Sequence, residues 1–312
     1  MFNSPVAVII ESLVAEPVGF TPFPVWPGTE EAGGIFVRRT PVVDPTATRT
    51  VYVHGLGGSS LNWTDLMGLR LPTSAGIALD LPGFGWSSPA SRHTLDAHAA
   101  AVIATIQREG AGPVDLVGNS MGGATSILVA ARRPDLVRSL TLIGPALPGQ
   151  RPKVEHLPIL LAGVPRVRDK MRELMMRRTP EQRVDELMAL IFFDPSTVTP
   201  ERRAEAIAEH ARRDELAHTW PAFAESAQSL ASSMLLRRGA AMWRALERVQ
   251  APVLGLFGTN DKLVDVRVAP KAAQRIRRGR VVVMPRMGHV AQMEDPVQVA
   301  DLMAAFGREF VA

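Results

Sequence analysis

The chain has 312 residues, of which 46% are hydrophobic and 21% charged, and its mean hydropathy is +0.07. This composition is typical of one large α/β domain with an insertion, and it excludes disordered, collagen-like and coiled-coil chains. The chain has no cysteine, which excludes disulfides, thiolate metal sites and a cysteine nucleophile. The formal net charge of +4 is too small to indicate a nucleic-acid partner.

The start of the sequence does not have the pattern of a secretion signal. The first basic residue is Arg38, and the apolar run 6–10 ends at Glu11, which is too short for the apolar core of a signal peptide. The longest apolar stretch, residues 187–193, is far shorter than the roughly 20 residues of a membrane helix. We therefore expect a cytoplasmic chain without a membrane span; no motif covers residues 1–20.

Short β-like runs separated by proline, glycine and aspartate predict strands near the N-terminus, at residues 23–26, 35–39 and 50–54. Strands and helices then alternate along the chain: strand 77–80, helix 95–109, strand 114–117, helix 121–133 and strand 140–143. Alternation at this spacing predicts a parallel sheet covered by helices.

This rhythm stops between about residues 145 and 248, where the pattern is mostly helical. Two helices are predicted in this block, at 180–191 and 200–216. Each begins with proline directly after a threonine that can cap its first turn. Strands and helices then resume at 253–257, 269–277, 281–284 and 296–310. We expect residues 1–145 and 249–312 to form the core, with residues 146–248 inserted between two strands as a helical cap.

The clearest chemical motif is Gly118-Asn119-Ser120-Met121-Gly122, which lies between a predicted strand and a predicted helix. This is the setting of a nucleophile elbow, in which a strained turn exposes a serine hydroxyl. Gly118 and Gly122 lack the Cβ atoms that would collide with the neighbouring strand and helix. Ser120 is therefore the candidate nucleophile.

A serine nucleophile needs a base to take its proton, and the base needs an acid to orient it. His289 follows the strand 281–284, and Asp261 follows the strand 253–257. Loops after the strands of a parallel sheet meet at the edge where sites assemble. Asp265 is the alternative acid, although its position suits a helix cap better. The order nucleophile, acid, base agrees with the nucleophile-elbow arrangement.

A glycine-rich HGLGG motif at residues 54–58 begins at the last residue of the third predicted strand. Gly55 and Gly57 allow backbone amides to approach a substrate oxygen. The two expected oxyanion donors are the N–H groups of Leu56, in this loop, and Met121, after the nucleophile. The histidine that opens the motif, His54, is expected to be structural.

Five motifs in this order resemble the α/β-hydrolase fold superfamily: HGLGG, DLPGFGWS at 80–87, GNSMGG at 118–123, GTND at 258–261 and GH at 288–289. The resemblance covers about residues 34–312 apart from the variable cap. It implies the α/β-hydrolase fold, with a mostly parallel central sheet flanked by helices and an inserted helical cap. It also implies a Ser-His-Asp hydrolase that acts through an acyl-enzyme, without specifying the substrate.

Related chemistries on this fold use different residues. Haloalkane dehalogenases and epoxide hydrolases attack with aspartate, and the latter also use cap tyrosines, whereas this chain has Ser120 and only Tyr52, in a predicted strand. Carbon–carbon bond hydrolases keep the serine triad but often have a proline in the oxyanion loop, which this chain lacks. We therefore expect a carboxylic-ester hydrolase. The alternatives are a carbon–carbon bond hydrolase, a lactonase or thioesterase, a cofactor-free haloperoxidase, and a low-turnover receptor.

The expected cap carries fifteen Arg and two Lys against fourteen acidic residues between residues 145 and 248. This interleaving predicts helix faces held by ion pairs. The alternative is that Arg177-Arg178 or Arg212-Arg213 steer an anionic substrate.

Flexible and aromatic side chains in the cap predict an adaptable apolar pocket or, equally, packing onto the sheet: Met171, Met175, Met176, Met188, Met234, Phe192, Phe193, Trp220 and Phe223. The cap histidines His156, His210 and His218 lack metal-ligand spacing. We expect no metal and no cofactor, and a small-molecule substrate with an apolar acyl or alcohol group.

Overall fold

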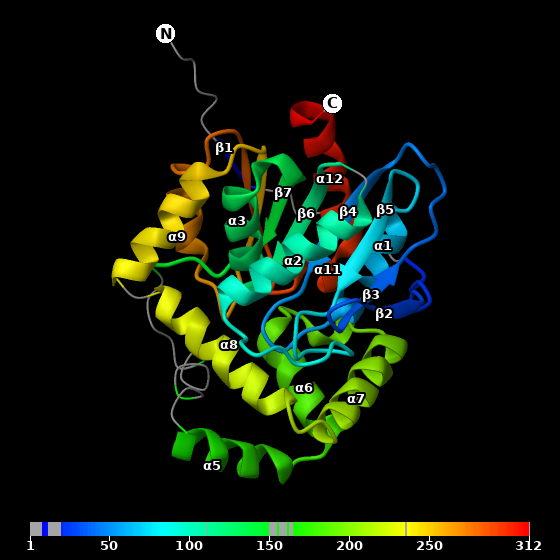
Figure 1. The fold of residues 1–312 in the computed structure, drawn as a ribbon, viewed down its shortest axis with the longest axis vertical. Helices are drawn as coiled ribbons and strands as arrows, with labels where there is room; N and C mark the ends of the chain where they lie inside the picture. The colour runs from blue at the N-terminus through cyan, green and yellow to red at the C-terminus, as the bar shows by residue number, and fades with distance from the viewer. Residues whose placement is uncertain are drawn as a thin grey trace.

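A computed structural model describes residues 8–11, 20–110, 112–149, 155, 161, 165–234 and 236–311. Its strands form one nine-stranded sheet in the order β1-β9-β8-β7-β6-β4-β5-β3-β2 (Figure 1). Neighbouring strands are parallel except where β3 pairs with β5 and with β2. The strands are β1 Val8–Glu11, β2 Gly28–Glu31, β3 Ile35–Arg39, β4 Thr48–Val53, β5 Ser74–Leu79, β6 Val114–Asn119, β7 Val137–Ile143, β8 Val253–Gly258 and β9 Gly279–Met284.

Helices cover both faces of this sheet, so the prediction of a mostly parallel sheet flanked by helices is confirmed. One face packs against α2 Leu95–Glu109, α3 Met121–Arg132, α9 Leu236–Arg248 and α10 Ala269–Ala273. The other face packs against α1 Thr64–Arg70, α11 Ala291–Glu294 and α12 Pro296–Phe310.

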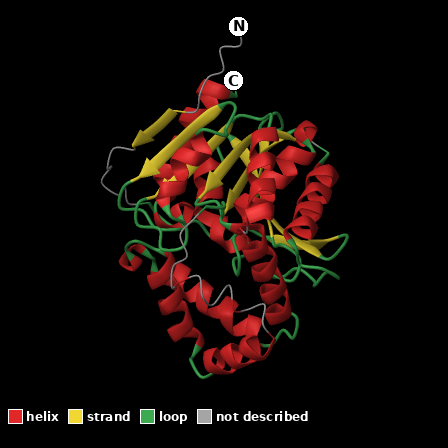
Figure 2. Ribbon diagram, turned by 90° about the vertical axis from the view of Figure 1, so that its left-hand side faces the viewer, coloured by secondary structure: helices red, strands yellow, loops and turns green. Residues whose placement is uncertain are grey.

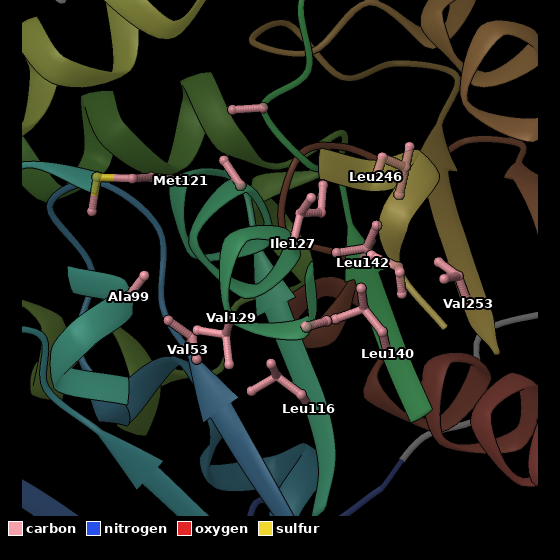
Figure 3. Packing of buried hydrophobic residues seen from close by; sticks show 14 of the residues in the cluster. Val53, Ala99, Leu116, Met121, Ile127, Val129, Leu140, Leu142, Leu246 and Val253 are labelled. Carbon is pink, nitrogen blue, oxygen red and sulfur yellow. The ribbon is translucent and has the colours of Figure 1, made fainter. Parts of the chain in front are cut away.

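Alternate residues of the central strands enter the two layers. In β4, Val51 and Val53 join the cluster beneath α3, whereas Tyr52 points to the opposite layer. Leu116 and Val117 of β6 divide in the same way, and Figure 3 shows Val53 and Leu116 in the layer beside α3. Because both faces are covered, the last three residues of β4, Val51 to Val53, are all apolar and buried, with no alternation of apolar and polar side chains.

Within the described ranges, four further helices lie between β7 and β8 in the sequence and occupy one end of the molecule, below the sheet in Figures 1 and 2. They are α5 Pro165–Met176, α6 Pro180–Ile191, α7 Pro200–Asp214 and α8 Thr219–Met234. The predicted starts of α6 and α7 are present, because Thr179 and Thr199 accept hydrogen bonds from backbone amides of the first turns. The helix α9 instead packs against α3 beside the sheet (Figure 1).

The strand predicted at residues 23–26 is wrong. Prolines at 22, 24 and 27 break up the row of amide donors that a strand needs. The Phe23 N–H donates instead to Asp65 Oδ1 at 2.9 Å, and the Trp26 indole donates to the Thr64 carbonyl at 2.9 Å.

Two predicted helices end earlier than the pattern indicated, α7 at residue 214 and α10 at residue 273. None of the helices in the described ranges is long and apolar enough to cross a membrane.

Candidate active site

The three candidate catalytic residues follow strands of one continuous parallel set. Ser120 follows β6, Asp261 follows β8 and His289 follows β9. β7 separates β6 from β8, and all these strands run in the same direction. Their following loops therefore lie at the same edge of the sheet.

The structure brings Asp261 and His289 into direct contact. Asp261 Oδ2 lies 2.7 Å from His289 Nδ1, and both side chains are buried. Asp261 Oδ1 accepts the N–H groups of Leu263 and Val264, each at 2.8 Å, which holds the carboxylate in place. Asp265, the alternative acid, caps the short helix η5 Val266–Val268 and forms an ion pair with Arg267.

Ser120 occupies a strained turn. Its φ of 54° and ψ of −117° lie outside the usual regions for a residue with a side chain. The turn is held by the Ser120 N–H, which donates to the Ile143 carbonyl at 3.0 Å. Within the described ranges, no hydrogen bond joins the Ser120 hydroxyl to His289. In enzymes without substrate this contact is often long.

The side chain of Asn119 connects this turn to the histidine loop. Its Nδ2 donates to the carbonyl oxygens of Ile143, at 2.9 Å, and His289, at 3.0 Å. The residue before the candidate nucleophile thus holds the backbone of the candidate base. The motif G-x-S-x-G gave no reason to expect this contact, because its middle positions are free to vary.

The motif glycines lie where the chain passes close to itself. A Cβ at Gly122 would lie 2.1 Å from the Val53 carbonyl oxygen, and one at Gly118 would lie 2.5 Å from the Gly122 carbonyl oxygen. A Cβ at Gly55 would lie 3.2 Å from Ser120 Cβ, so the HGLGG loop runs directly beside the candidate nucleophile. Gly57 has a φ of +72°, which favours glycine.

The HGLGG loop is a tight turn with one firmly held peptide. The Gly55 carbonyl accepts from the Gly58 N–H at 3.0 Å and lies 2.7 Å from His54 Nδ1. His54 Nε2 accepts the Leu81 N–H at 2.9 Å, so Nδ1 carries the proton and donates. Burial lowers the pKa of His54 to about 4 and keeps the ring neutral.

Two amides beside this turn have no protein acceptor in the part of the chain that the structure describes. Among the residues that the structure describes, neither the Leu56 N–H nor the Met121 N–H donates to a protein oxygen. Met121 is the first residue of α3, so its amide also belongs to the unpaired set at a helix N-terminus. Both groups are free to bind an oxygen atom of a ligand.

The end of α6 is attached to the histidine loop by Glu294, a residue that the motifs did not reveal. Glu294 Oε1 accepts the N–H groups of Phe193 and Asp194 at 2.8 and 2.9 Å, and Oε2 accepts the Gly288 N–H at 2.8 Å. Burial raises the pKa of this carboxyl, and the three N–H donors act in the opposite sense. The His289 N–H also donates to the last residue of α6, at the Ile191 carbonyl (2.7 Å).

Glu294→Gln is expected to lower the free energy of unfolding by about 1–3 kcal/mol, because an amide has one acceptor oxygen where the carboxylate has two. The matched control is Glu173→Gln in α5, whose ion pairs with Lys170 and Arg177 are exposed and contribute little. Urea unfolding at pH 7 measures both variants. Equal stabilities for the two variants would contradict the role of Glu294.

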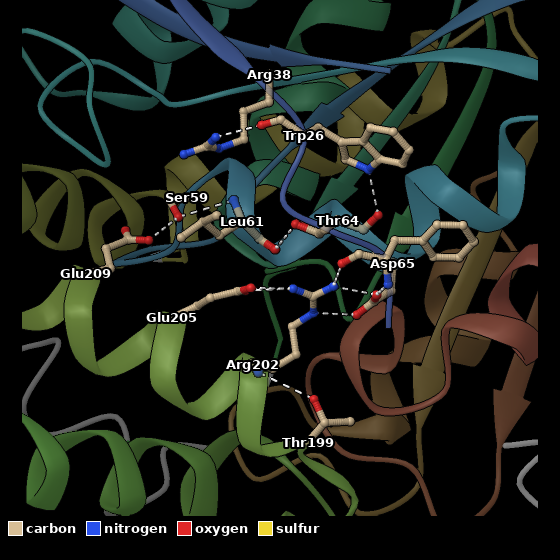
Figure 4. A network of polar contacts seen from close by, with 11 residues as sticks. Trp26, Arg38, Ser59, Leu61, Thr64, Asp65, Thr199, Arg202, Glu205 and Glu209 are labelled. Atoms are coloured by element: carbon tan, nitrogen blue, oxygen red, sulfur yellow. Dashed lines mark hydrogen bonds and ion pairs between the residues drawn. The ribbon is translucent and has the colours of Figure 1, made fainter. Parts of the chain in front are cut away.

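The helix α7 is attached to the core at both ends. In its first turn, Arg202 donates to both oxygens of Asp65 at 2.7 and 2.6 Å and also binds Glu205 (Figure 4). In its last turns, Arg213 pairs with Glu209 and donates to the Gly57 carbonyl, and Glu209 accepts the Ser59 hydroxyl. Burial alone would raise the pKa of Glu209, but the charge of Arg213 and a hydrogen bond from Ser59 outweigh it and lower the pKa.

The paired arginines singled out as candidates for steering a substrate bind the protein itself. Arg177 pairs with Glu173 and Arg178 with Glu186. Arg212 donates to the Gly85 carbonyl and lies over the Trp86 ring, 4.1 Å from its centroid. Arg213 donates to carbonyls of the HGLGG loop. These contacts favour the interpretation of the cap charges as ion-paired helix faces.

Apolar side chains of the helical block, residues 165–234, lie next to both the histidine loop and the HGLGG loop. Met188 and Phe192 form a buried cluster with Val290, next to His289. Phe223 and Leu56 pack against the same small cluster, Ala224 and Ala227, and Phe223 stacks on Trp220 with ring centroids 5.5 Å apart. Met176 and Phe193 are exposed instead, and His156 lies outside the described residues.

A family model described as the alpha/beta hydrolase fold matches residues 51–296, and the chain belongs to this family. The dihydrolipoyllysine-residue acetyltransferase component of the acetoin cleaving system of Pseudomonas putida is 30% identical over 294 residues, which are 91% of this chain and 70% of that protein. A pimeloyl-[acyl-carrier protein] methyl ester esterase of Neisseria meningitidis is 29% identical over 281 residues, 86% of this chain and 78% of that protein.

Solved structures agree on the fold. A serine hydrolase of Cycloclasticus zankles is similar with a TM-score of 0.73 at 19% identity, covering 91% of this chain and 98% of that chain. A thermophilic esterase of Thermogutta terrifontis has a TM-score of 0.68 at 22% identity, covering 96% of this chain and all of that one. The predicted α/β-hydrolase fold is therefore confirmed, and relatives of the chain include esterases.

Proposed function

We propose that this protein is a serine hydrolase that cleaves a carboxylic ester of a small molecule through an acyl-enzyme. The observation that carries the proposal is the buried bond between Asp261 and His289, on loops at the same edge as the strained Ser120. One relative, the pimeloyl-[acyl-carrier protein] methyl ester esterase, cleaves an ester by its name, which supports the same reaction class.

In the proposed reaction, Ser120 Oγ attacks the ester carbonyl carbon while His289 Nε2 takes the hydroxyl proton. Asp261 holds the imidazole by Nδ1 and stabilises its positive charge. The negative oxygen of the tetrahedral intermediate binds the free N–H groups of Leu56 and Met121. The intermediate collapses, the C–O bond breaks, and His289 returns the proton to the leaving alcohol. A water molecule then attacks the acyl-enzyme while His289 takes its proton. The second intermediate collapses, Ser120 Oγ leaves and regains the proton from His289, and the acid is released.

The helical residues 146–248 act as the cap in this proposal, and they supply an apolar surface for the acyl or alcohol group. Met188 and Phe192 beside His289, and Phe223 beside Leu56, support an apolar substrate. No cofactor or metal takes part in the proposed steps, and the proposed location is the cytoplasm.

Labelling with a fluorophosphonate tests this function directly. The reagent is expected to modify Ser120 alone, as found by mass spectrometry of peptides, and to abolish hydrolysis of p-nitrophenyl esters at the same rate. The same assay with thioesters, lactones and vinylogous diketones tests the other hydrolases of this fold. Labelling of another residue, or full ester turnover after complete labelling, would contradict the proposal. Labelling without turnover of any substrate would favour a receptor.

A further inference from the structure

The exit of the HGLGG turn is held by an arginine from α7. Arg213 Nη1 donates to the Gly57 carbonyl at 2.6 Å, and its Nη2 donates to the Gly58 carbonyl at 3.2 Å. Arg213 lies more than 150 positions after these two glycines in the sequence. The Arg213 side chain is only 15% exposed, so these bonds are largely shielded from water.

Glu209 keeps this guanidinium in place and binds the next residue of the same loop. It pairs with Arg213 one helical turn away, and its Oε2 accepts the Ser59 hydroxyl at 2.7 Å (Figure 4). Its side chain is 7% exposed. Three consecutive loop residues, Gly57, Gly58 and Ser59, are therefore bound by two neighbouring side chains of α7.

The orientation of one peptide follows from these contacts. In a trans peptide the C=O and N–H bonds point in opposite directions. The Gly55 carbonyl is fixed by the Gly58 N–H and by His54, so the Leu56 N–H of the same peptide points the other way. The Gly58 N–H that donates to this carbonyl is also held. Arg213 binds the Gly57 carbonyl, which belongs to the same peptide as the Gly58 N–H, and the Gly58 carbonyl that follows it. The direction of the Leu56 N–H thus depends on α7 being in place.

We propose that Arg213, oriented by Glu209, is a positioning residue that holds the HGLGG loop so that the Leu56 N–H can stabilise the oxyanion. This inference rests on the proposed function. The helical block then contributes to catalysis from outside the core: the oxyanion site is complete only when α7 lies against the loop.

Kinetics of Arg213→Ala and Arg212→Ala test the proposal with a matched pair. Both residues lie in the last turn of α7 and donate to core carbonyls, but Arg212 donates to Gly85 and not to a carbonyl of the HGLGG loop. With p-nitrophenyl acetate, Arg213→Ala is expected to lower kcat about 10- to 100-fold with little change in KM, because the donor is misplaced rather than removed. Arg212→Ala is expected to change kcat less than twofold. Arg213→Lys should lie between, since one ammonium cannot replace the planar fork.

Amide hydrogen exchange of residues 55–60 gives a second readout that needs no substrate. Exchange is expected to be faster in Arg213→Ala and unchanged in Arg212→Ala. Equal losses of kcat in both variants, or unchanged kcat and exchange in Arg213→Ala, would overturn the positioning role and leave the proposed function standing. A wild-type protein that neither labels at Ser120 nor hydrolyses any ester would instead overturn the proposed function, and the catalytic role of Arg213 with it.

Discussion

Ser120→Ala is expected to lower kcat for ester hydrolysis by on the order of 10⁶-fold, because no other hydroxyl in the proposed mechanism can form the acyl-enzyme. The fold should be unaffected. Alanine meets the same backbone strain at a φ of 54°, and within the described chain the Ser120 hydroxyl forms no hydrogen bond to His289 that would be lost. The free energy of unfolding should therefore change by less than about 0.5 kcal/mol.

The matched control for this variant is Ser126→Ala. Ser126 lies in α3, is fully buried, and its hydroxyl has no hydrogen-bond partner among the described residues. This variant should keep wild-type kcat. Initial rates with p-nitrophenyl acetate, measured beside urea unfolding, separate catalysis from stability. Comparable rates for Ser120→Ala and the wild type would show that another nucleophile acts.

The largest expected effect on stability comes from two buried histidines in acid. Burial lowers the pKa of His54 to about 4 and of His98 to about 3, from an ordinary value of 6.5. The unfolded chain therefore binds protons below pH 6.5 that the native protein does not bind. The two rings leave the free energy of unfolding unchanged above pH 6.5. As the pH falls from 6.5 toward 4, each ring lowers it by roughly 1.4 kcal/mol per pH unit.

His98→Gln isolates one of these two contributions. His98 Nε2 lies 2.9 Å from Ser226 Oγ, which donates to the His93 carbonyl, so the amide of glutamine can keep the donation to Ser226. The stability of the wild type relative to His98→Gln is expected to fall by about 3 kcal/mol between pH 6 and pH 4. Urea unfolding across this range measures the difference. A difference independent of pH would show that His98 is not kept neutral by burial.

Elements with strong local signals were predicted well. β3, α2, α6 and α12 begin and end where the pattern placed them, since caps, prolines and apolar spacing act within a few residues. The loops that carry the candidate catalytic residues also follow from local rules, because a residue after a parallel strand must lie at its carboxyl end.

Contacts between distant segments were not predictable in this way. β1 lies in the short apolar run 6–10, and that run alone does not indicate its partner, because β1 pairs with β9, about 270 positions later. Arg213 and Glu294 look like ordinary surface charges on helices until the fold places their backbone partners beside them. The attachment of the helical block to both candidate loops therefore became visible only with the structure.

The pairing of β1 with β9 also affects how the protein can be shortened. β9 carries the histidine loop, and β1 occupies its outer hydrogen-bonding side. A chain trimmed past residue 11 would present that side of β9 as an open template on which the strand of another molecule could add. With β1 present, the edge strand beside the proposed base has four residues in place of the six of β9, and a shorter edge offers fewer unpaired backbone groups to another molecule.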